Sequence, residues 1–293
     1  MSNTISNASY ANALFLDRAQ GQLTQSIDRL SSGTNSVTDL GSSGVSTTAK
    51  LTSQNARIQA ANTNVQNAMS YEQAASGFTG NIADVLSRMT ELATLAKDPT
   101  KAASDISDYA DEFSQLQMQL RDTIGGTSAQ IGGSFDVTSP MGSFDGISLF
   151  GSTAPGTVQV GPNPTDKLNL PSMNLQTGSM LTLIQQDSAG NFTLSITDPN
   201  AVTDIANAQT QVSDIDASVG AASASLSRAS DSLNSQSLNV QGTISSIQDV
   251  DVASESTKLA KFQILTQSST AMLAQEQQDP KAILNLLSSI KTK

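Results

Sequence analysis

The chain has 293 residues and a formal net charge of −11, so electrostatic repulsion argues against a nucleic-acid backbone as its partner. Cys and His are both absent, which excludes disulfide bonds, thiolate chemistry and the commonest general base and metal ligand. Aromatic residues make up only 4% of the chain, a composition that predicts narrow buried stripes and no thick core.

The N-terminal segment predicts an amphipathic helix that ends at Ser31-Ser32-Gly33. Met1–Gln20 lacks a basic head followed by an apolar run, so we expect no cleavable secretory signal. No stretch approaches the roughly 20 apolar residues of a membrane-spanning helix, and we expect a soluble chain. The apolar stripe of this first helix consists of Leu16, Ala19, Leu23, Ile27 and Leu30.

Two further helices are expected before residue 125. A Gly/Ser/Thr-rich joint covers Ser31 to Thr48, and a helical apolar pattern then continues from Leu51 to Ala96, where Pro99 ends it. Within this second helix one row keeps a seven-residue step, while the row beside it drifts around the helix. The row with the fixed step consists of Ala61, Ala68, Ala75, Ile82, Met89 and Ala96. A third helix is predicted from Ile106 to Ile124, because two glycines follow it.

Residues 125–199 cannot continue the helical pattern, because they hold 11 of the 19 Gly and six of the eight Pro. Apolar and polar residues alternate along Thr157–Val160 and again along Asn191–Thr197. The second run follows the turn-like sequence Asp187–Gly190. We therefore expect β-hairpins in this region.

The C-terminal third contains seven aliphatic residues at a fixed seven-residue step, which is the signature of a coiled-coil seam. The row three residues further on is mostly small, so the partner helix can approach closely. A helix along this seam would be about 65 Å long, and we expect it to wind left-handed against the Ile58–Ala96 helix. The seam consists of Ile205, Val212, Val219, Leu226, Leu233, Val240 and Ile247.

A final amphipathic segment follows Asp249 and Asp251. Its apolar stripe and that of the first helix have no obvious partner in the chain except each other. They either pack together as a helical hairpin or bind partner molecules. The stripe of this last segment includes Leu259, Phe262, Leu265, Met272, Leu273, Leu286 and Leu287.

The expected fold is mainly α. The N- and C-terminal segments form a long antiparallel coiled-coil rod, and a small β-hairpin insert lies in the middle of the chain. The predicted parts are two halves of a terminal helical domain, two halves of the rod, and the Gly/Pro-rich insert between them. Their ranges are 1–42 and 249–293 for the terminal domain, 43–125 and 201–248 for the rod, and 126–200 for the insert.

Several motifs in order along the chain resemble those of bacterial flagellins. Ile27–Gly33 resembles the N-terminal signature of the family, and Phe144–Phe150 and Val158–Asn163 are similar to its central motifs. Asp249–Glu255 resembles its acidic joint, and Leu273–Pro280 follows at the family's spacing. Each motif alone is weak, but their order around a coiled coil makes the resemblance strong.

The resemblance implies a subunit that polymerises into the flagellar filament after export through the flagellar type III channel. It also implies the flagellar cap, junction proteins and an export chaperone as partners, and an extracellular location. The terminal segments would form an inner tube, and the seam helices a second shell with the insert outward. The joint Thr34–Gly44 departs from the family's usual sequence.

The resemblance also suggests which residues meet neighbouring subunits. Leu86–Leu92 is similar to the flagellin segment that an innate immune receptor recognises, and in the family the same patch packs between subunits. A solvated ion pair between Arg88 and Glu91 is the simpler interpretation of these residues. The interface candidates are Leu16, Leu23, Ile27, Leu30, Arg88, Glu91, Leu92, Leu259, Phe262, Leu265, Met272, Leu273, Leu286 and Leu287.

No Gly-rich phosphate loop, nucleophile elbow or metal-ligand cluster is present in the sequence, so we expect no enzyme, cofactor or metal site. Two other functions stay open. The chain could be a hook–filament junction protein of the same family, present in few copies, or a secreted coiled-coil protein that never polymerises.

Overall fold

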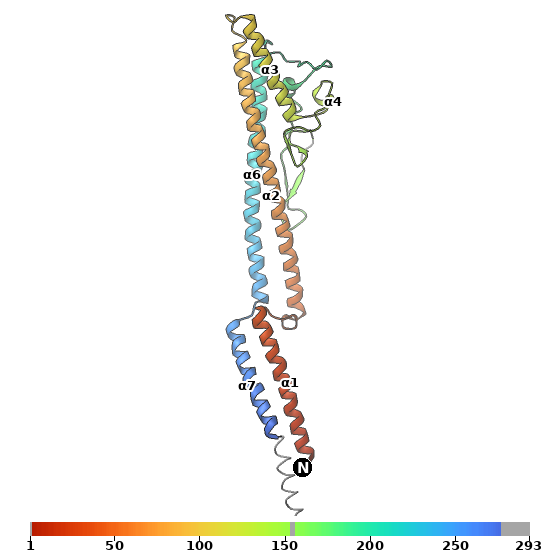
Figure 1. Ribbon diagram of the computed structural model, residues 1–293, viewed down its shortest axis with the longest axis vertical. Coiled ribbons are helices and arrows are strands. Elements are labelled where there is room, and N and C mark those ends of the chain that lie inside the picture. The colour runs from red at the N-terminus through yellow and green to blue at the C-terminus, as the bar shows by residue number, and fades with distance from the viewer. Residues whose placement is uncertain (1, 153–155, 277–293) are drawn as a thin grey trace, which may run out of the picture. The chain divides into compact units, whose positions relative to one another are not determined.

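The computed structural model describes residues 2–152 and 156–276, and long helices dominate it (Figure 1). The chain divides into two compact units, one of residues 1–53 with 239–293 and one of residues 54–238. The helices are α1 (Ser2–Ser32), α2 (Val37–Leu95), α3 (Ala103–Ile124), α4 (Ser128–Ile131), α5 (Ser179–Ile184), α6 (Ala201–Gln248) and α7 (Val252–Glu276), and the strands are β1 (Ser143–Phe144), β2 (Ile147–Ser148), β3 (Thr157–Gln159) and β4 (Lys167–Asn169).

The mainly α fold with a small β insert is confirmed, and so are the predicted helix ends. Gly33 follows α1 with a positive φ of 73°, a conformation that a glycine adopts without strain. Gly125 caps α3 in the same way, and its N–H donates to the carbonyl of Arg121 over 2.8 Å. Among the described residues, no helix is both long and apolar enough to span a bilayer.

The joint between the first and second helices is shorter than expected. Helix α2 already begins at Val37, and the break within it is confined to Gly41, whose φ of 64° and ψ of 174° are not helical. The Gly/Ser/Thr-rich residues that follow are helical although these residue types are weak helix formers. The hydroxyl of Thr47 donates to the carbonyl of Ser43 one turn earlier over 2.9 Å, so it is satisfied within the helix.

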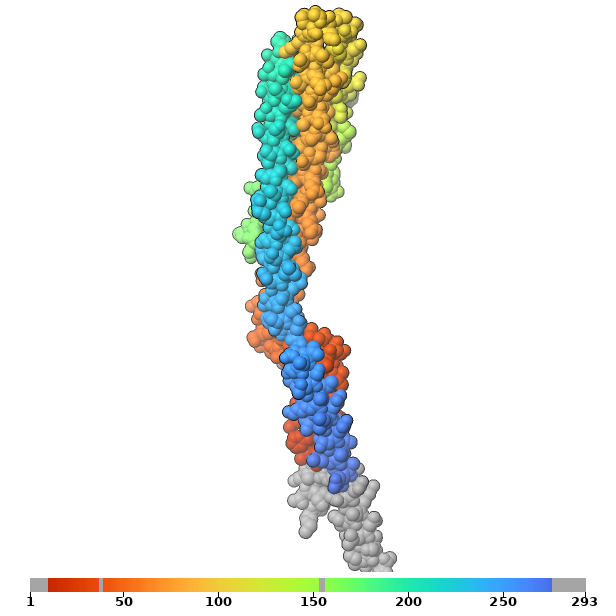
Figure 2. Space-filling model, turned by 90° about the vertical axis from the view of Figure 1, so that its left-hand side faces the viewer, coloured from red at the N-terminus to blue at the C-terminus, as the bar shows by residue number. Residues whose placement is uncertain are grey.

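Helices α2 and α6 run antiparallel within the 54–238 unit (Figures 1 and 2). The hydrogen bonds between the two helices show this direction, because residues near the end of α2 bond to residues near the beginning of α6. Ser237 donates to Asn55, whereas Gln209 donates to Thr90. Five residues of the predicted seam are buried in this unit, namely Ile205, Val212, Val219, Leu226 and Leu233.

On α2, two seven-residue rows are buried along the facing side. One row is mostly small or aliphatic, as predicted. The other keeps its step more strictly than the sequence pattern indicated, because it includes two polar residues, Glu72 and Thr79. The rows are Ala61, Ala68, Ala75, Ile82 and Met89, and Ile58, Val65, Glu72, Thr79, Leu86 and Ala93.

The insert contains two separate two-stranded antiparallel sheets. Strand β1 pairs with β2 around the turn Asp145-Gly146, where both residues have positive φ, as a type I′ hairpin turn requires. Strand β3 pairs with β4, so the strand predicted at Thr157–Val160 is confirmed for its first three residues.

The prediction of a second strand at Asn191–Thr197 is wrong. Only Phe192 forms a β-bridge there, with Gln186. The alternation has another cause, because Leu194 and Ile196 are buried in the core of the unit while the backbone turns away at Asp198. The carbonyl of Leu194 accepts a hydrogen bond from the Gln117 side chain of α3 instead of from a neighbouring strand.

A buried arginine holds the insert against α3. The guanidinium of Arg121 donates to four backbone carbonyls, those of Ile131, Ile184, Gly132 and Phe135, over 2.6–3.3 Å. Burial lowers the pKa of Arg121 from its ordinary value. The planar fork with several donors suits this role, because one side chain satisfies carbonyls at the end of α4, in the segment after it and at the end of α5.

Replacing Arg121 by Met should therefore destabilise the 54–238 unit by about 2–4 kcal/mol, since several buried carbonyls lose their donors. Urea unfolding of the full-length chain measures the change. Arg228→Met is the matched control, because Arg228 is exposed and donates to the hydroxyl of Ser225 on the same helix. Equal stability of the two variants would show that the carbonyl contacts of Arg121 contribute nothing.

Candidate assembly surfaces

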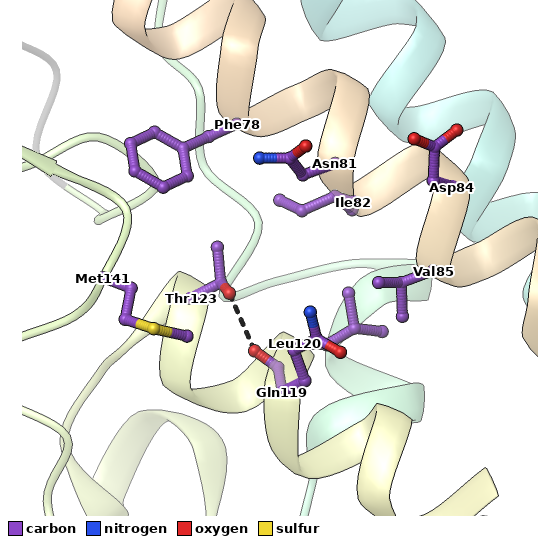
Figure 3. A pocket seen from close by; sticks show the side chains of 9 residues that line it. All are labelled: Phe78, Asn81, Ile82, Asp84, Val85, Gln119, Leu120, Thr123 and Met141. Atoms are coloured by element: carbon purple, nitrogen blue, oxygen red, sulfur yellow. Dashed lines mark hydrogen bonds between the residues drawn. The ribbon is translucent and has the colours of Figure 1, made fainter. Parts of the chain in front are cut away.

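The 54–238 unit has a groove of about 460 Å³ between α2, α3 and the loop before β1 (Figure 3). Its lining is mostly apolar, with Phe78, Ile82, Val85, Leu120 and Met141. The hydroxyl of Thr123 donates to the carbonyl of Gln119 within α3 over 2.8 Å, so it is engaged in the helix. Among the lining residues, no hydroxyl is paired with a basic side chain.

Helices α1 and α7 pack against each other in the other unit (Figure 2). Their contact is shallow, because Ala19 is the one hydrophobic residue that is fully buried among the described side chains of the two helices. The remaining residues along the contact are half-buried. These are Leu16, Leu23 and Leu30 of α1 and Leu259, Phe262 and Leu273 of α7.

The same pair of helices leaves large apolar side chains open to water. Phe15 is 61% exposed beside the half-buried Leu16, and Ile264 is 66% exposed beside Leu265, which is itself exposed. A lone two-helix pair cannot bury both faces of each helix, so this apolar surface needs another partner. Its exposed members are Tyr10, Leu14, Phe15, Ile27, Val252, Ile264, Leu265 and Met272.

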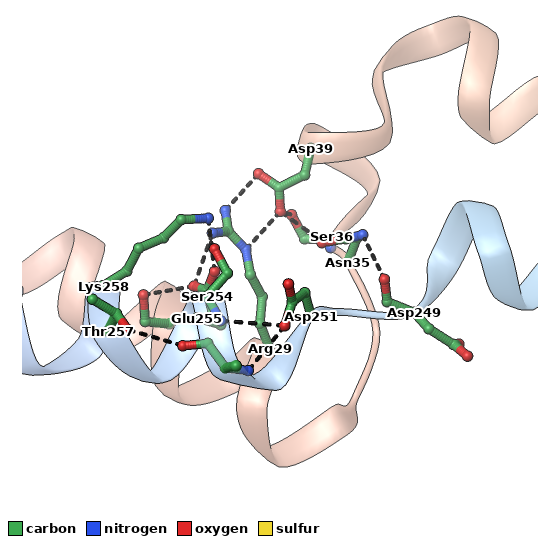
Figure 4. Close-up of polar contacts among 12 residues, drawn as sticks. Arg29, Asn35, Ser36, Asp39, Asp249, Asp251, Ser254, Glu255, Thr257 and Lys258 are labelled. Carbon is green, nitrogen blue, oxygen red and sulfur yellow. Dashed lines mark hydrogen bonds and ion pairs between the residues drawn. The ribbon is translucent and has the colours of Figure 1, made fainter.

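Arg29 joins α1 to the beginnings of α2 and α7 (Figure 4). Its Nε and Nη2 donate to the two carboxylate oxygens of Asp39 over 2.8 and 2.5 Å. Its Nη1 donates to Glu255 over 3.2 Å. Glu255 is buried and also accepts from Ser26 over 2.7 Å and from Lys258 over 3.0 Å. We call these five residues the junction cluster.

The junction cluster favours ionised carboxylates. Hydrogen bonds from Ser36 and then Arg29 lower the pKa of Asp39 from its ordinary value. Burial alone would raise the pKa of Glu255, but hydrogen bonds from Ser26, Lys258 and Arg29 outweigh it and lower that pKa. Both groups therefore stabilise the folded state above their ordinary pKa values, and this contribution is lost as the pH falls through the lowered values.

Backbone contacts complete the junction. Asn35 donates to the carbonyl of Gln248 over 2.6 Å, and Val250 donates to that of Gly33 over 3.0 Å. Asp251 caps α7, because its carboxylate accepts the backbone N–H groups of Ala253 and Ser254. Within residues 2–152 and 156–276, no three acidic residues come together as metal ligands.

A second exposed cluster surrounds Arg88 on α2. Arg88 forms the expected pair with Glu91 over 2.9 Å and also donates to both carboxylate oxygens of Glu112 on α3 over 2.7 and 3.0 Å. The hydrogen bonds to Glu112 and then Glu91 raise the pKa of Arg88. Leu92 is fully buried in the core beneath this cluster, so only its polar neighbours are open to a partner.

The structure brings some sequence-predicted residues together and separates others. Leu16, Leu23, Leu30, Leu259, Phe262 and Leu273 lie along one contact, while Ile27, Leu265 and Met272 are exposed. Val240 and Ile247, the last two seam residues, are half-buried in the unit that contains α1 and α7. Leu286 and Leu287 lie outside the described residues.

Two family models match the chain. The bacterial flagellin N-terminal helical region matches residues 3–130, and the bacterial flagellin C-terminal helical region matches residues 202–287. The chain is also 31% identical to the flagellar filament 30.7 kDa core protein of Treponema maltophilum, over 95% of this chain and 96% of that one. The chain belongs to the bacterial flagellin family.

Other flagellin relatives match over a similar length. The flagellin of Listeria monocytogenes is 25% identical over 94% of this chain and 95% of its own length. The flagellar filament 33 kDa core protein of Treponema phagedenis is 30% identical over 94% of this chain and 97% of its own. The family match therefore covers the central insert as well as the helices at both ends.

Sequence reasoning missed several residues of these surfaces. Phe15 and Ile264 could have been found, because each forms an adjacent apolar pair with the next residue and so widens the apolar face beyond one stripe. Glu112 could not have been found in this way. It is 24 residues from Arg88 in sequence, and only the packing of α3 brings it there.

Replacing Glu255 by Gln should loosen the α1–α7 pair by about 2 kcal/mol, because Arg29 and Lys258 lose the negative charge they pair with, and the amide NH2 that replaces one carboxylate oxygen cannot accept a hydrogen bond. The amides of α1 and α7 should then exchange with deuterium about 30-fold faster at pH 7. Asp28→Asn is the control, since Asp28 is exposed beside Arg29 and outside the cluster. If both variants exchange at the wild-type rate, the cluster does not hold these helices together.

Proposed function

We propose that this flagellin is a structural subunit that polymerises into the bacterial flagellar filament for swimming motility. The observation that carries the proposal is the apolar surface that α1 and α7 leave exposed after packing on each other. Membership of a family whose relatives are named as flagellar filament core proteins supports it.

Assembly would supply the partner that this surface lacks. Burying one Phe or Ile side chain that is exposed in the subunit contributes about 1.5–3 kcal/mol. Several such side chains lie on each helix, so neighbouring subunits can offset the entropy lost on association. Contacts between unlike surfaces that do not close into a ring produce a helical polymer, and the two helices present different surfaces.

The proposed layers follow the parts predicted from sequence. Residues 1–42 and 249–293 would form the inner tube, and residues 43–125 and 201–248 would form the next shell with residues 126–200 on its outer side. The shallow α1–α7 contact supports an inner position, because it leaves the most apolar surface to cover. Arg88 and Glu91 would meet a neighbouring subunit, and recognition by an innate immune receptor is a second use of the same exposed patch.

Export and accessory partners rest on family membership alone. We propose export through the flagellar type III pathway to the cell exterior, with the flagellar cap, junction proteins and an export chaperone as partners. We assign no catalytic role or cofactor. The absence of His and Cys from the sequence and the structural character of the family support this assignment.

Replacing Ile264 by Ser should raise the critical concentration for assembly about 10- to 100-fold, because an apolar side chain no longer leaves water on assembly. The fold of the subunit should not change, since Ile264 is 66% exposed in it. Sedimentation of polymer at a series of subunit concentrations measures the effect, and circular dichroism checks the fold.

Gln263→Ser is the matched control, because Gln263 is the exposed polar neighbour on the same helix. It should assemble like the wild type. If Ile264→Ser also assembles like the wild type, the exposed face of α7 is not an assembly surface. If the wild-type chain forms no filaments in electron micrographs, and is present in only a few copies per sheared filament, the junction-protein alternative replaces this proposal.

A further inference from the structure

Glu72 occupies a core position of the α2–α6 coiled coil. It belongs to the buried row that continues from Val65 to Thr79, and its side chain is 0% exposed. Thr79, one heptad further along, donates to Asp216 of α6 over 3.1 Å, so this row faces α6. Within the described part of the chain, neither carboxylate oxygen of Glu72 has a hydrogen-bond partner.

The elements packed around Glu72 offer it no cation. On α2, the residues one turn away are Ala68, Met69, Ala75 and Ser76, all of them uncharged. The neighbouring Tyr71 packs edge-on against Phe144 of β1 with the ring centroids 5.8 Å apart, which places the β1–β2 hairpin beside this turn of α2.

The charged side chains of α6 and of the β1–β2 hairpin are either acidic or already hydrogen-bonded to other residues. On α6, Asp216 accepts from Ser76 and Thr79, and Arg228 is exposed and donates to Ser225. In the β1–β2 hairpin, Asp145 lies in the turn next to Phe144. Among the described residues, Glu72 takes part in no ion pair.

An ionised carboxylate at such a position loses its hydration and gains nothing in return, so burial favours the neutral acid. Burial raises the pKa of Glu72 to about 7. It also raises the pKa of Tyr71, with a smaller contribution from the negative charge of Glu72. The carboxyl group thus changes its charge near neutral pH inside a seam whose neighbouring core residues are small or apolar.

We propose that Glu72 makes this stretch of the α2–α6 coiled coil a pH-responsive element, closed while the carboxyl is protonated and locally opened when it is ionised. Opening lets water reach the carboxylate, and it separates the small residues of the two helices that otherwise lie in contact. The device belongs to the folded subunit and does not depend on assembly.

The direction of the pH dependence follows from linkage. Because the pKa of Glu72 is raised from 4.5 to about 7, the folded state holds a proton that the unfolded chain releases. The stabilising contribution of the neutral acid is complete below pH 4.5 and is lost as the pH rises to about 7. Above that pH the loss is constant. The junction cluster has the opposite dependence.

The test compares the wild-type chain with Glu72→Gln by urea unfolding of dilute full-length monomer between pH 4 and pH 8.5. Gln cannot ionise, so the folding equilibrium constant of the variant relative to the wild type should rise as the pH increases from about 4.5 to about 7. The rise should reach up to about 300-fold, which corresponds to the full pKa change. A difference in stability between the two proteins that is the same at every pH reflects only the burial of the amide introduced by Glu72→Gln, and not ionisation.

Asp84→Asn is the matched control, because it removes one acidic charge from an exposed position of the same helix. The folding equilibrium constant of this control relative to the wild type should not rise between about pH 4.5 and about 7, as that of Glu72→Gln should. A flat ratio for Glu72→Gln, or the same slope in the control, would overturn the proposal.

A local readout separates Glu72 from every other group. The chain has five Glu residues, so labelling glutamate carboxyl carbons with carbon-13 gives few signals, and the one lost in Glu72→Gln is assigned to Glu72. That signal should titrate near pH 7, and titration near pH 4.5 would refute the proposal. Glu72→Gln should still form filaments, so failure of assembly and failure of this device are distinguishable.

Discussion

Two long helices that run side by side can bury only a narrow stripe of each other, and the rest of this structure follows from that limit. In the 54–238 unit, the stripe of α6 is mostly aliphatic, and that of α2 mixes Ala with larger apolar residues and two polar ones. The small residues allow close approach but bury little apolar area. The unit gains the remainder of its core from α3, α5 and the insert, whose side chains join the same buried cluster.

The insert contributes to that core without much regular structure of its own. Its four strands have two or three residues each, so most of its backbone groups lack partners in a sheet. Side chains from α3 supply part of what is missing. Arg121 and Gln117 together donate to six backbone carbonyls, and these contacts hold the end of α5, the segment after α4 and the loop at Leu194 against α3.

The sequence was most informative for features that depend on the residue pattern of a single helix. The helices, their glycine stops and the five buried seam residues of α6 follow from local periodicity. The strand expected at Asn191–Thr197 failed because alternation reports only which side chains are buried, and Leu194 and Ile196 are buried by a loop. The early start of α2 was missed because Gly, Ser and Thr are weak helix formers, and tertiary contacts such as Arg29 with Asp39 override that tendency.

The register of α2 against α6 depends on more than the seam itself. Asn62 donates to Asn234 over 2.9 Å and accepts from Ser230, while Ser237 donates to Asn55 over 2.8 Å. A slide of α6 by one heptad would bring Ser230 opposite Asn55 in place of Ser237, so these polar contacts alone do not select one register. The side chain of Gln211 on α6 does distinguish registers, because it accepts from the backbone N–H of Met180 and donates to the carbonyls of Asn174 and Thr177. The residues one heptad away are Asp204, whose carboxylate cannot donate, and Ser218, whose side chain is shorter. The apolar rows therefore bring α2 and α6 together, and the contacts of α6 with the insert decide where along their length they meet.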